Sequence, residues 1–70
     1  MHMANTTIFV QEATTGPTIQ SIEALLNELE GIERVLIDTD DGEVKVEFDD
    51  SKISKERIVI TLQQHNFHIQ

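Results

Sequence analysis

The spacing of hydrophobic residues changes from one segment of this chain to the next, and the order of these changes limits the fold more than any other feature. In residues 6–12 apolar and polar positions alternate, with Ile8 and Val10 on one side, as in a half-buried β-strand. After a Gly-Pro pair the spacing becomes three and four, which predicts a helix with one apolar face that ends at Gly31. That face consists of Ile19, Ile22, Leu25, Leu26 and Leu29.

The next two segments predict a β-hairpin. Residues 34–39 alternate between apolar and polar, and a second alternating segment begins after Gly42. Asp41 and Gly42 between them tolerate the positive φ angles that a tight turn requires. The apolar positions of the two strands are Val35, Ile37, Val44, Val46 and Phe48.

Residues 55–64 carry conflicting local signals. The β-branched run at 58–61 favours a strand. Ser54 is well placed as an N-cap, apolar residues lie four positions apart, and Asn66 suits the left-handed position after a helix. We therefore predict a helix over 55–64, with a strand as the alternative, followed by a short last strand at 67–69.

The resulting order is βαββαβ, which predicts an α+β, ferredoxin-like fold with a four-stranded antiparallel sheet and two helices on one face. A chain of 70 residues is enough for one small domain, which we place at 6–70. Residues 1–5 are expected to be a disordered N-terminus or a cloning remnant, with no functional role for Met1 and His2. The chain has no cysteine, so no disulfide supports the core.

The charge of the chain restricts its partners. It contains 13 acidic and 5 basic residues, for a net charge of −8, and no lysine or arginine precedes Arg34. Nucleic acid and anionic membrane surfaces would be repelled, whereas a basic protein partner is compatible. No apolar run reaches the length of about 18 residues that a membrane span needs, and no signal-peptide pattern is present, so we expect no membrane insertion and a cytoplasmic location.

The ordered pattern resembles the heavy-metal-associated (HMA) domain, the module of copper chaperones and of the N-termini of metal-transporting P-type ATPases. The correspondence extends over residues 8–69 without a gap. It is carried by Ser21, Ile22, Glu23, Leu25, Leu26, Leu29, Glu30, Gly31, Ile32, Val35, Ile37, Val44, Val46, Phe48, Asp49, Ile53, Ser54, Glu56, Ile58, Leu62, Asn66 and Phe67. The resemblance implies the ferredoxin-like fold and a metal-binding loop between the first strand and the first helix.

That loop departs from the family pattern. The family binds soft metal ions with the two thiolates of a Met-x-Cys-x-x-Cys motif, whereas this chain has Ala13, Thr15 and Thr18 at the three positions. A threonine hydroxyl is a hard, weak donor and does not replace a thiolate. The hydroxyls have a structural explanation, because Thr14, Thr15 or Gly16 can cap the first helix; an anion on the free N–H groups is the alternative.

His65 is the remaining candidate ligand. In the family its position lies in a loop that faces the metal-binding loop, and an imidazole binds zinc or divalent copper. A surface histidine near a helix C-terminus is the competing interpretation. His68 is expected on the opposite face from Phe67 and Ile69, away from His65. We expect no cofactor, with a divalent metal ion at His65 as the alternative.

No other group of residues suggests chemistry. The carboxylates around the hairpin turn lack the spacing of an EF-hand loop, and neither a nucleophile motif nor a phosphate-binding glycine loop is present, so the chain is not expected to be an enzyme.

The sequence thus predicts a degenerate HMA domain that docks to another protein, a metal-transport ATPase or a basic partner. The expected docking residues are Thr14, Thr15, Gly16, Thr18, Gln20 and Glu23. The alternatives are a metal carrier that uses His65 and a small-molecule sensor, and no pattern in the sequence specifies the oligomeric state.

Overall fold

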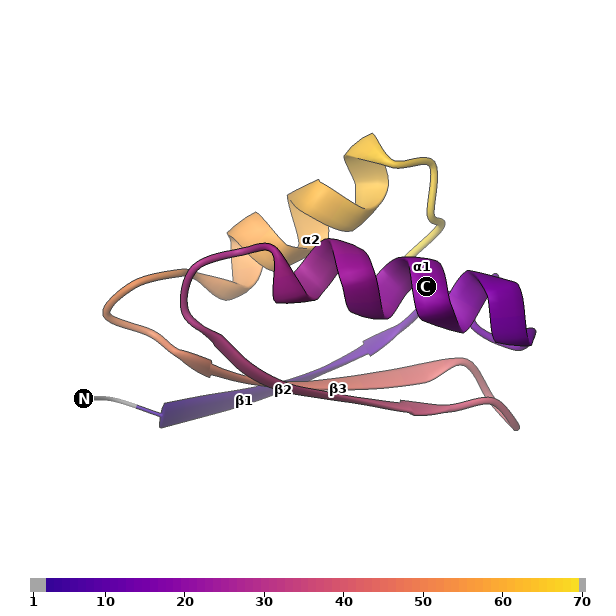
Figure 1. Ribbon diagram of the computed structural model, residues 1–70, viewed down its shortest axis with the longest axis horizontal. Coiled ribbons are helices and arrows are strands. Elements are labelled where there is room, and N and C mark those ends of the chain that lie inside the picture. The colour runs from indigo at the N-terminus through magenta and orange to yellow at the C-terminus, as the bar shows by residue number, and fades with distance from the viewer. Residues whose placement is uncertain (1–2, 70) are drawn as a thin grey trace.

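A computed structural model describes residues 3–69 as two helices lying on one face of an antiparallel sheet (Figure 1). The elements are β1 (Met3–Phe9), α1 (Gly16–Asn27), β2 (Ile32–Asp38), β3 (Glu43–Asp49) and α2 (Lys55–Gln64). The strand order is β1-β3-β2, so β3 lies in the centre and is antiparallel to both neighbours. This is the ferredoxin-like arrangement without a complete fourth strand.

The fourth strand that the sequence predicts at 67–69 is absent from the described part of the chain. Its remnant is one isolated bridge between Val10 and Ile69. Two contacts hold the preceding residues outside a strand ladder: the Phe67 N–H donates to Leu62 O across 3.1 Å, and the His68 N–H donates to the carboxylate of Glu12. The C-terminal segment is therefore attached to the end of α2 and to the first loop, and β1 is an edge strand.

The first strand lies three residues earlier than the sequence suggests. β1 covers Met3–Phe9 in place of 6–12, and its pairing with β3 begins at Met3 opposite Asp49. Residues 3–5, which we assigned to a disordered N-terminus, thus belong to the sheet, while Met1, His2 and Gln70 lie outside the described residues. The strand stops before residue 12 because the chain turns inward, with the Ala13 N–H bonded to Val10 O.

The hairpin agrees with its sequence signals. β2 and β3 are joined by residues 39–42, and Gly42 adopts a φ of +73°. A Cβ at Gly42 would lie 2.4 Å from Val10 O, so the turn needs glycine for space as well as for conformation. α1 ends at Asn27, earlier than expected, and Gly31 (φ +100°) follows in the turn that leads to β2.

α2 is a helix despite its β-branched run. Its bounds are those that the sequence predicts, and the Ser54 hydroxyl accepts the Arg57 N–H across 3.2 Å as the expected N-cap. Asn66 takes the left-handed conformation with a φ of +67°. Ile58 and Leu62 are both fully buried, so burial of about 1.5–3 kcal/mol per side chain outweighs a propensity cost of a few tenths of a kcal/mol per residue.

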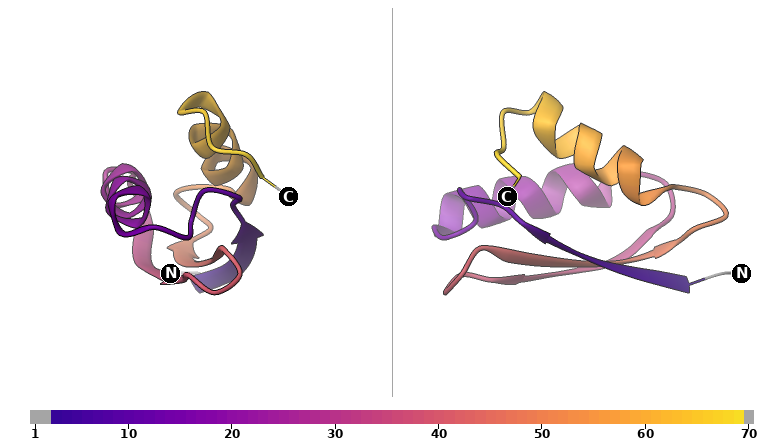
Figure 2. Two further views of the ribbon diagram at one scale, coloured as in Figure 1. Left: turned by 90° about the vertical axis from the view of Figure 1, so that its right-hand side faces the viewer. Right: turned by 180° about the vertical axis from the view of Figure 1, so that it is seen from behind.

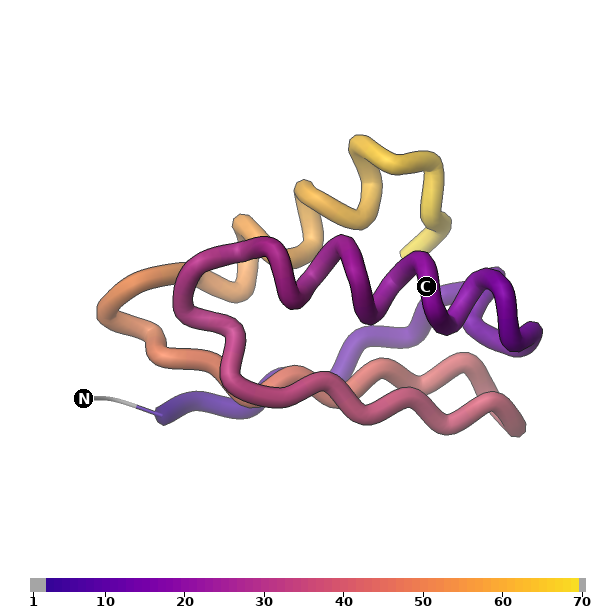
Figure 3. The backbone as a smooth tube through the Cα atoms, viewed as in Figure 1, coloured from indigo at the N-terminus to yellow at the C-terminus, as the bar shows by residue number. Residues whose placement is uncertain are grey.

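The helices form a layer over one face of the sheet (Figures 2 and 3), and the core residues come from both layers. Its most buried large side chains, all less than 2% exposed, are Ile22, Leu26, Ile58, Leu62, Val10, Val44 and Val46. The opposite face of the sheet bears no helix (Figure 2, left). Neither helix of the described residues has the length and hydrophobicity needed to cross a membrane.

Candidate functional site

Three kinds of contact fix the loop between β1 and α1: buried side chains, a bond to the hairpin turn, and backbone bonds within the loop. Val10 and Ala13 are buried side chains that anchor it to the core. The Val10 N–H donates to Gly42 O across 2.9 Å, which ties the end of β1 to the hairpin turn. The Ala13 N–H donates to Val10 O (3.1 Å) and the Thr14 N–H donates to Glu12 O (2.8 Å), so local backbone bonds fix the turn itself.

The two hydroxyls that replace the thiolates bond to each other. Thr15 Oγ1 donates to Thr18 Oγ1 across 2.9 Å. Thr15 is the N-cap residue of α1, but its side chain does not accept a helix N–H, so the expected capping bond is not made. Thr14 and Gly16 lie beside it on the surface, and Gly16 is the first residue of the helix.

The remaining predicted docking residues lie further along α1. Gln20 is exposed and Glu23 is half-buried, while Thr18 is half-buried in the first turn of the helix. From Ala13 to Ile22 the sequence contains no charged side chain. The loop and the first turns of α1 thus form a neutral polar surface in a strongly acidic chain.

His65 lies apart from this loop. It is the C-cap residue of α2, and its Nδ1 donates to Thr61 O across 2.9 Å. It lines a shallow hollow of about 450 Å³ beside the middle of α1. The other lining residues are Ser21, Ala24, Leu25, Glu28 and Phe67, none of which belongs to residues 13–18. Within residues 3–69, no group of three His, Cys, Asp or Glu side chains could hold a metal ion.

A pair that sequence reasoning missed joins the first loop to the C-terminal segment. The His68 N–H donates to Glu12 Oε1 across 2.9 Å, and His68 Nδ1 contacts Oε2 of the same carboxylate. The hydrogen bond from the His68 side chain, followed by that from its backbone N–H, lowers the pKa of Glu12 below its usual value. The two residues are 56 positions apart, and no spacing rule in a single sequence connects them. The His68 side chain is exposed while Phe67 and Ile69 are half-buried, as the alternation predicts.

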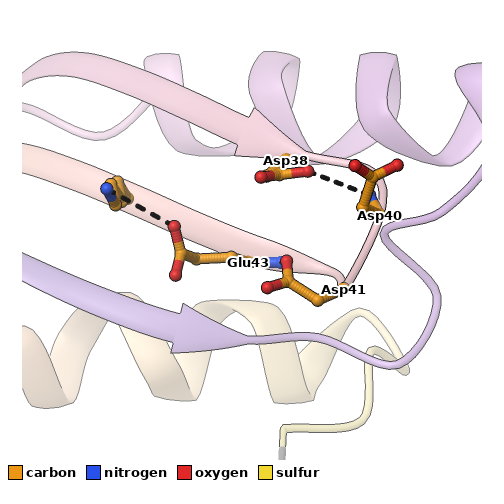
Figure 4. A network of polar contacts seen from close by, with 5 residues as sticks. Asp38, Asp40, Asp41 and Glu43 are labelled. Carbon is orange, nitrogen blue, oxygen red and sulfur yellow. Dashed lines mark hydrogen bonds and ion pairs between the residues drawn. The ribbon is translucent and has the colours of Figure 1, made fainter.

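The acidic hairpin turn uses its carboxylates to organise the backbone (Figure 4). Asp38 accepts the Asp40 N–H (3.0 Å), and Asp41 accepts the Glu43 N–H (3.1 Å). Glu43 in turn forms an ion pair with Lys45, with 3.5 Å between Nζ and Oε1. These bonds give the cluster a structural role in a solvated turn.

The sequence of this chain matches a known protein family. The model of the heavy-metal-associated domain matches residues 7–68. The chain belongs to the HMA domain family. No curated protein sequence matches it significantly.

Solved structures of other proteins share the fold. The CopZ metallochaperone superposes with a TM-score of 0.89 at 19% identity, covering 96% of this chain and 100% of that one. Oxidized MerP from Ralstonia metallidurans CH34 gives 0.87 at 18% identity (97% and 94%), and apo-CopP from Helicobacter pylori gives 0.84 at 22% identity (96% and 100%). This HMA domain has no cysteine, so it lacks the thiolate pair of the Met-x-Cys-x-x-Cys loop.

Proposed function

We propose that this HMA domain is a protein-docking module related to metal trafficking that carries no thiolate-bound metal. The observation that supports it best is the 2.9 Å bond between the hydroxyls of Thr15 and Thr18. The Thr15 hydroxyl donates to the Thr18 hydroxyl, and buried anchors and backbone bonds connect the loop to the rest of the fold. These contacts need no ion, and a loop anchored in this way loses little conformational entropy on docking.

The proposed docking surface is the uncharged stretch of residues 13–22, which covers the loop and the first turns of α1, together with Glu23 at its end. It comprises Thr14, Thr15, Gly16, Thr18, Gln20 and Glu23. Neutral hydroxyls and amides cost less to desolvate than charged groups, and they can donate to and accept from a partner. The net charge of −8 on the whole chain favours encounter with a basic partner. A domain of a metal-transport ATPase with a basic docking face fits both requirements.

The docking proposal is tested by titrating the isotope-labelled chain with the soluble N-terminal domain of a metal-transporting P-type ATPase and recording amide chemical shifts. We expect the shifts to concentrate in residues 14–23. Gln20→Arg should weaken the complex about tenfold by placing a cation in the contact. Gln64→Arg is the matched control, since Gln64 is also an exposed glutamine but lies on α2, and it should change the affinity less than about twofold. Shifts confined to the β2–β3 hairpin would refute this surface.

Metal binding is tested separately. Titration with copper(I) in the presence of a competing chelator should give no stoichiometric complex of submicromolar affinity, because the chain offers no thiolate. A parallel zinc titration examines the alternative at His65, and His65→Ala should leave its result unchanged. Tight copper(I) binding would contradict the proposal, and tight zinc binding would favour the alternative site at His65. Neither result affects the docking experiment.

A further inference from the structure

β1 and β2 are the two edges of the sheet, and only one of them is protected against pairing with another strand. β2 carries Glu33, Arg34 and Asp38 and has an irregular register between Ile32 and Arg34. Charges and bulges are the usual means by which edge strands avoid intermolecular pairing. β1 contains no charged residue, no proline and no register shift over its 7 residues.

The outer edge of β1 is also open. The one bridge from the C-terminal segment, at Val10, lies beyond the end of the strand, so no other described strand pairs with residues 3–9 along that edge. Seen from behind, β1 runs along the near side of the molecule with no segment crossing in front of it (Figure 2, right). Backbone groups along this edge are therefore available to a further strand.

We propose that β1 pairs antiparallel with β1 of a second copy of this chain, which joins the two sheets into one across a two-fold axis. The charge distribution makes β1 the place where a second copy is least repelled. Two copies with a net charge of −8 each repel one another wherever acidic surfaces meet, and β1 is a strand without charge. Self-pairing at this strand brings no carboxylates opposite each other.

The side chains of β1 are self-complementary in this arrangement. With Thr6 on the axis, Met3 lies opposite Phe9 of the second copy, and Ala4 lies opposite Ile8. Met3 and Phe9 are two of the exposed large hydrophobic residues of the domain, at 50% and 39%, and both project from the face that bears no helix. In this register odd-numbered residues lie opposite odd-numbered residues, and even-numbered opposite even-numbered. Each side chain is therefore paired with a side chain on the same face of the joined sheet.

The helix layer is consistent with the same axis. α2 lies on the side of the molecule where β1 forms the edge (Figure 2, right), so a two-fold axis perpendicular to the sheet brings the two α2 helices close together. α2 offers Val59 and Ile60 in a hollow of about 320 Å³ that is also lined by Lys55 and Glu56. Its apolar residues and opposite charges suit a contact with an identical helix.

Sedimentation velocity of the 70-residue chain over about 10 µM to 1 mM tests the proposal, with a dimer expected at the upper end. Thr7→Glu should weaken that dimer about tenfold or more by adding two carboxylates to the neutral contact. Leu36→Glu is the matched control: Thr7 and Leu36 both lie opposite Lys45, on the two different edges of the sheet. It should leave dimerisation unchanged, whereas a monomer at every concentration, or equal effects of both variants, would overturn the proposal.

Cross-linking supplies a test that does not depend on the stability of the Thr7 variant. The doubly substituted chain Asn5→Cys with Thr7→Cys should form disulfide-linked dimers on mild oxidation, because these positions lie opposite each other across the axis at a distance that a disulfide spans. The pair Arg34→Cys with Leu36→Cys has the same spacing on β2 and should remain monomeric. Cross-linking through β2 in preference to β1 would contradict the assignment.

Discussion

The carboxylate of Glu12 binds both the backbone N–H and the Nδ1 of His68, which joins the first loop to the C-terminal segment. The Gln11 N–H adds a bond of 3.0 Å to His68 O. An ionised carboxylate only accepts hydrogen bonds, so Nδ1 carries the hydrogen of the side-chain contact. In the described part of this HMA domain, the contact joins the two segments where the sequence predicts a fourth strand.

The first prediction concerns the acid dependence of this contact. The folded-state pKa of Glu12 lies below its ordinary value of 4.5, so the contact stabilises the fold fully above that pH, and the stabilisation is lost as the pH falls through the folded pKa. Thermal unfolding should therefore show Glu12→Gln less stable than the wild type at neutral pH and equal to it in acid. His68→Ala should reduce this difference without abolishing it, because the backbone N–H of residue 68 still donates to Glu12 Oε1. A difference that persists undiminished in acid would assign the effect to something other than ionisation.

The second prediction restores the lost ligands. Thr15→Cys with Thr18→Cys places two thiols where the hydroxyl oxygens are now 2.9 Å apart, which is close enough for both to bind one ion. We expect the doubly substituted chain to bind copper(I) stoichiometrically, because thiolates are the preferred ligands of that ion. Chelator competition measures the affinity.

The matched control for that experiment is Thr14→Cys with Thr18→Cys, which introduces the same number of thiols at a different spacing. It should bind copper(I) at least about tenfold more weakly, since one thiol is then displaced from the ligand position. Equal affinities would show that thiol number, and not the geometry of this loop, determines binding.

Local patterns were sufficient to predict most of the fold. The apolar spacing of α1, the turn at Gly42 and the cap at Ser54 are properties of neighbouring residues, and all three are present in the structure. The prediction of a fourth strand was wrong because alternation at Phe67 and Ile69 indicates which side chains are buried. It does not indicate whether the backbone pairs with a neighbouring strand. The backbone N–H groups of Phe67 and His68 donate to Leu62 O and to the Glu12 carboxylate instead of to a strand. Glu12 is distant in sequence, so no local pattern reveals its contact.

For the candidate site, too, the identities of the residues could be predicted from the sequence, and their spatial contacts could not. The loss of the thiolates at Thr15 and Thr18 is evident from residue identity, whereas the bond between their hydroxyls depends on backbone angles that place Thr15 just before the helix. The position of His65 beside the middle of α1 depends on how the two helices pack, and a single sequence contains no record of that packing.

The third prediction compares two isoleucines of α2. Ile58 is fully buried in the core and Ile60 is 44% exposed, although they lie two residues apart in the same β-branched run. Ile58→Ala should lower the free energy of unfolding by about 2–5 kcal/mol through lost burial and the cavity that remains. Ile60→Ala should change it by less than about 1 kcal/mol, since alanine also improves helix propensity. Chemical denaturation measures both free energies of unfolding. Similar losses would contradict the orientation of α2 in which Ile58 faces the core and Ile60 faces solvent.

The fourth prediction compares two glycines. Gly42 has a φ of +73°, and a Cβ there would meet Val10 O at 2.4 Å, whereas a Cβ at Gly16 has no atom within 4 Å. Gly42→Ala should therefore destabilise the domain by about 1–3 kcal/mol, because either the turn or the Val10 backbone must move. Gly16→Ala at the start of α1 should be neutral or stabilising by up to about 1 kcal/mol, since alanine restricts the unfolded chain and suits a helix. Urea denaturation of both variants checks the pair. The Gly42 variant should also lose amide-exchange protection at Val10, whose N–H donates to Gly42 O; retained protection there would argue against strain at this turn.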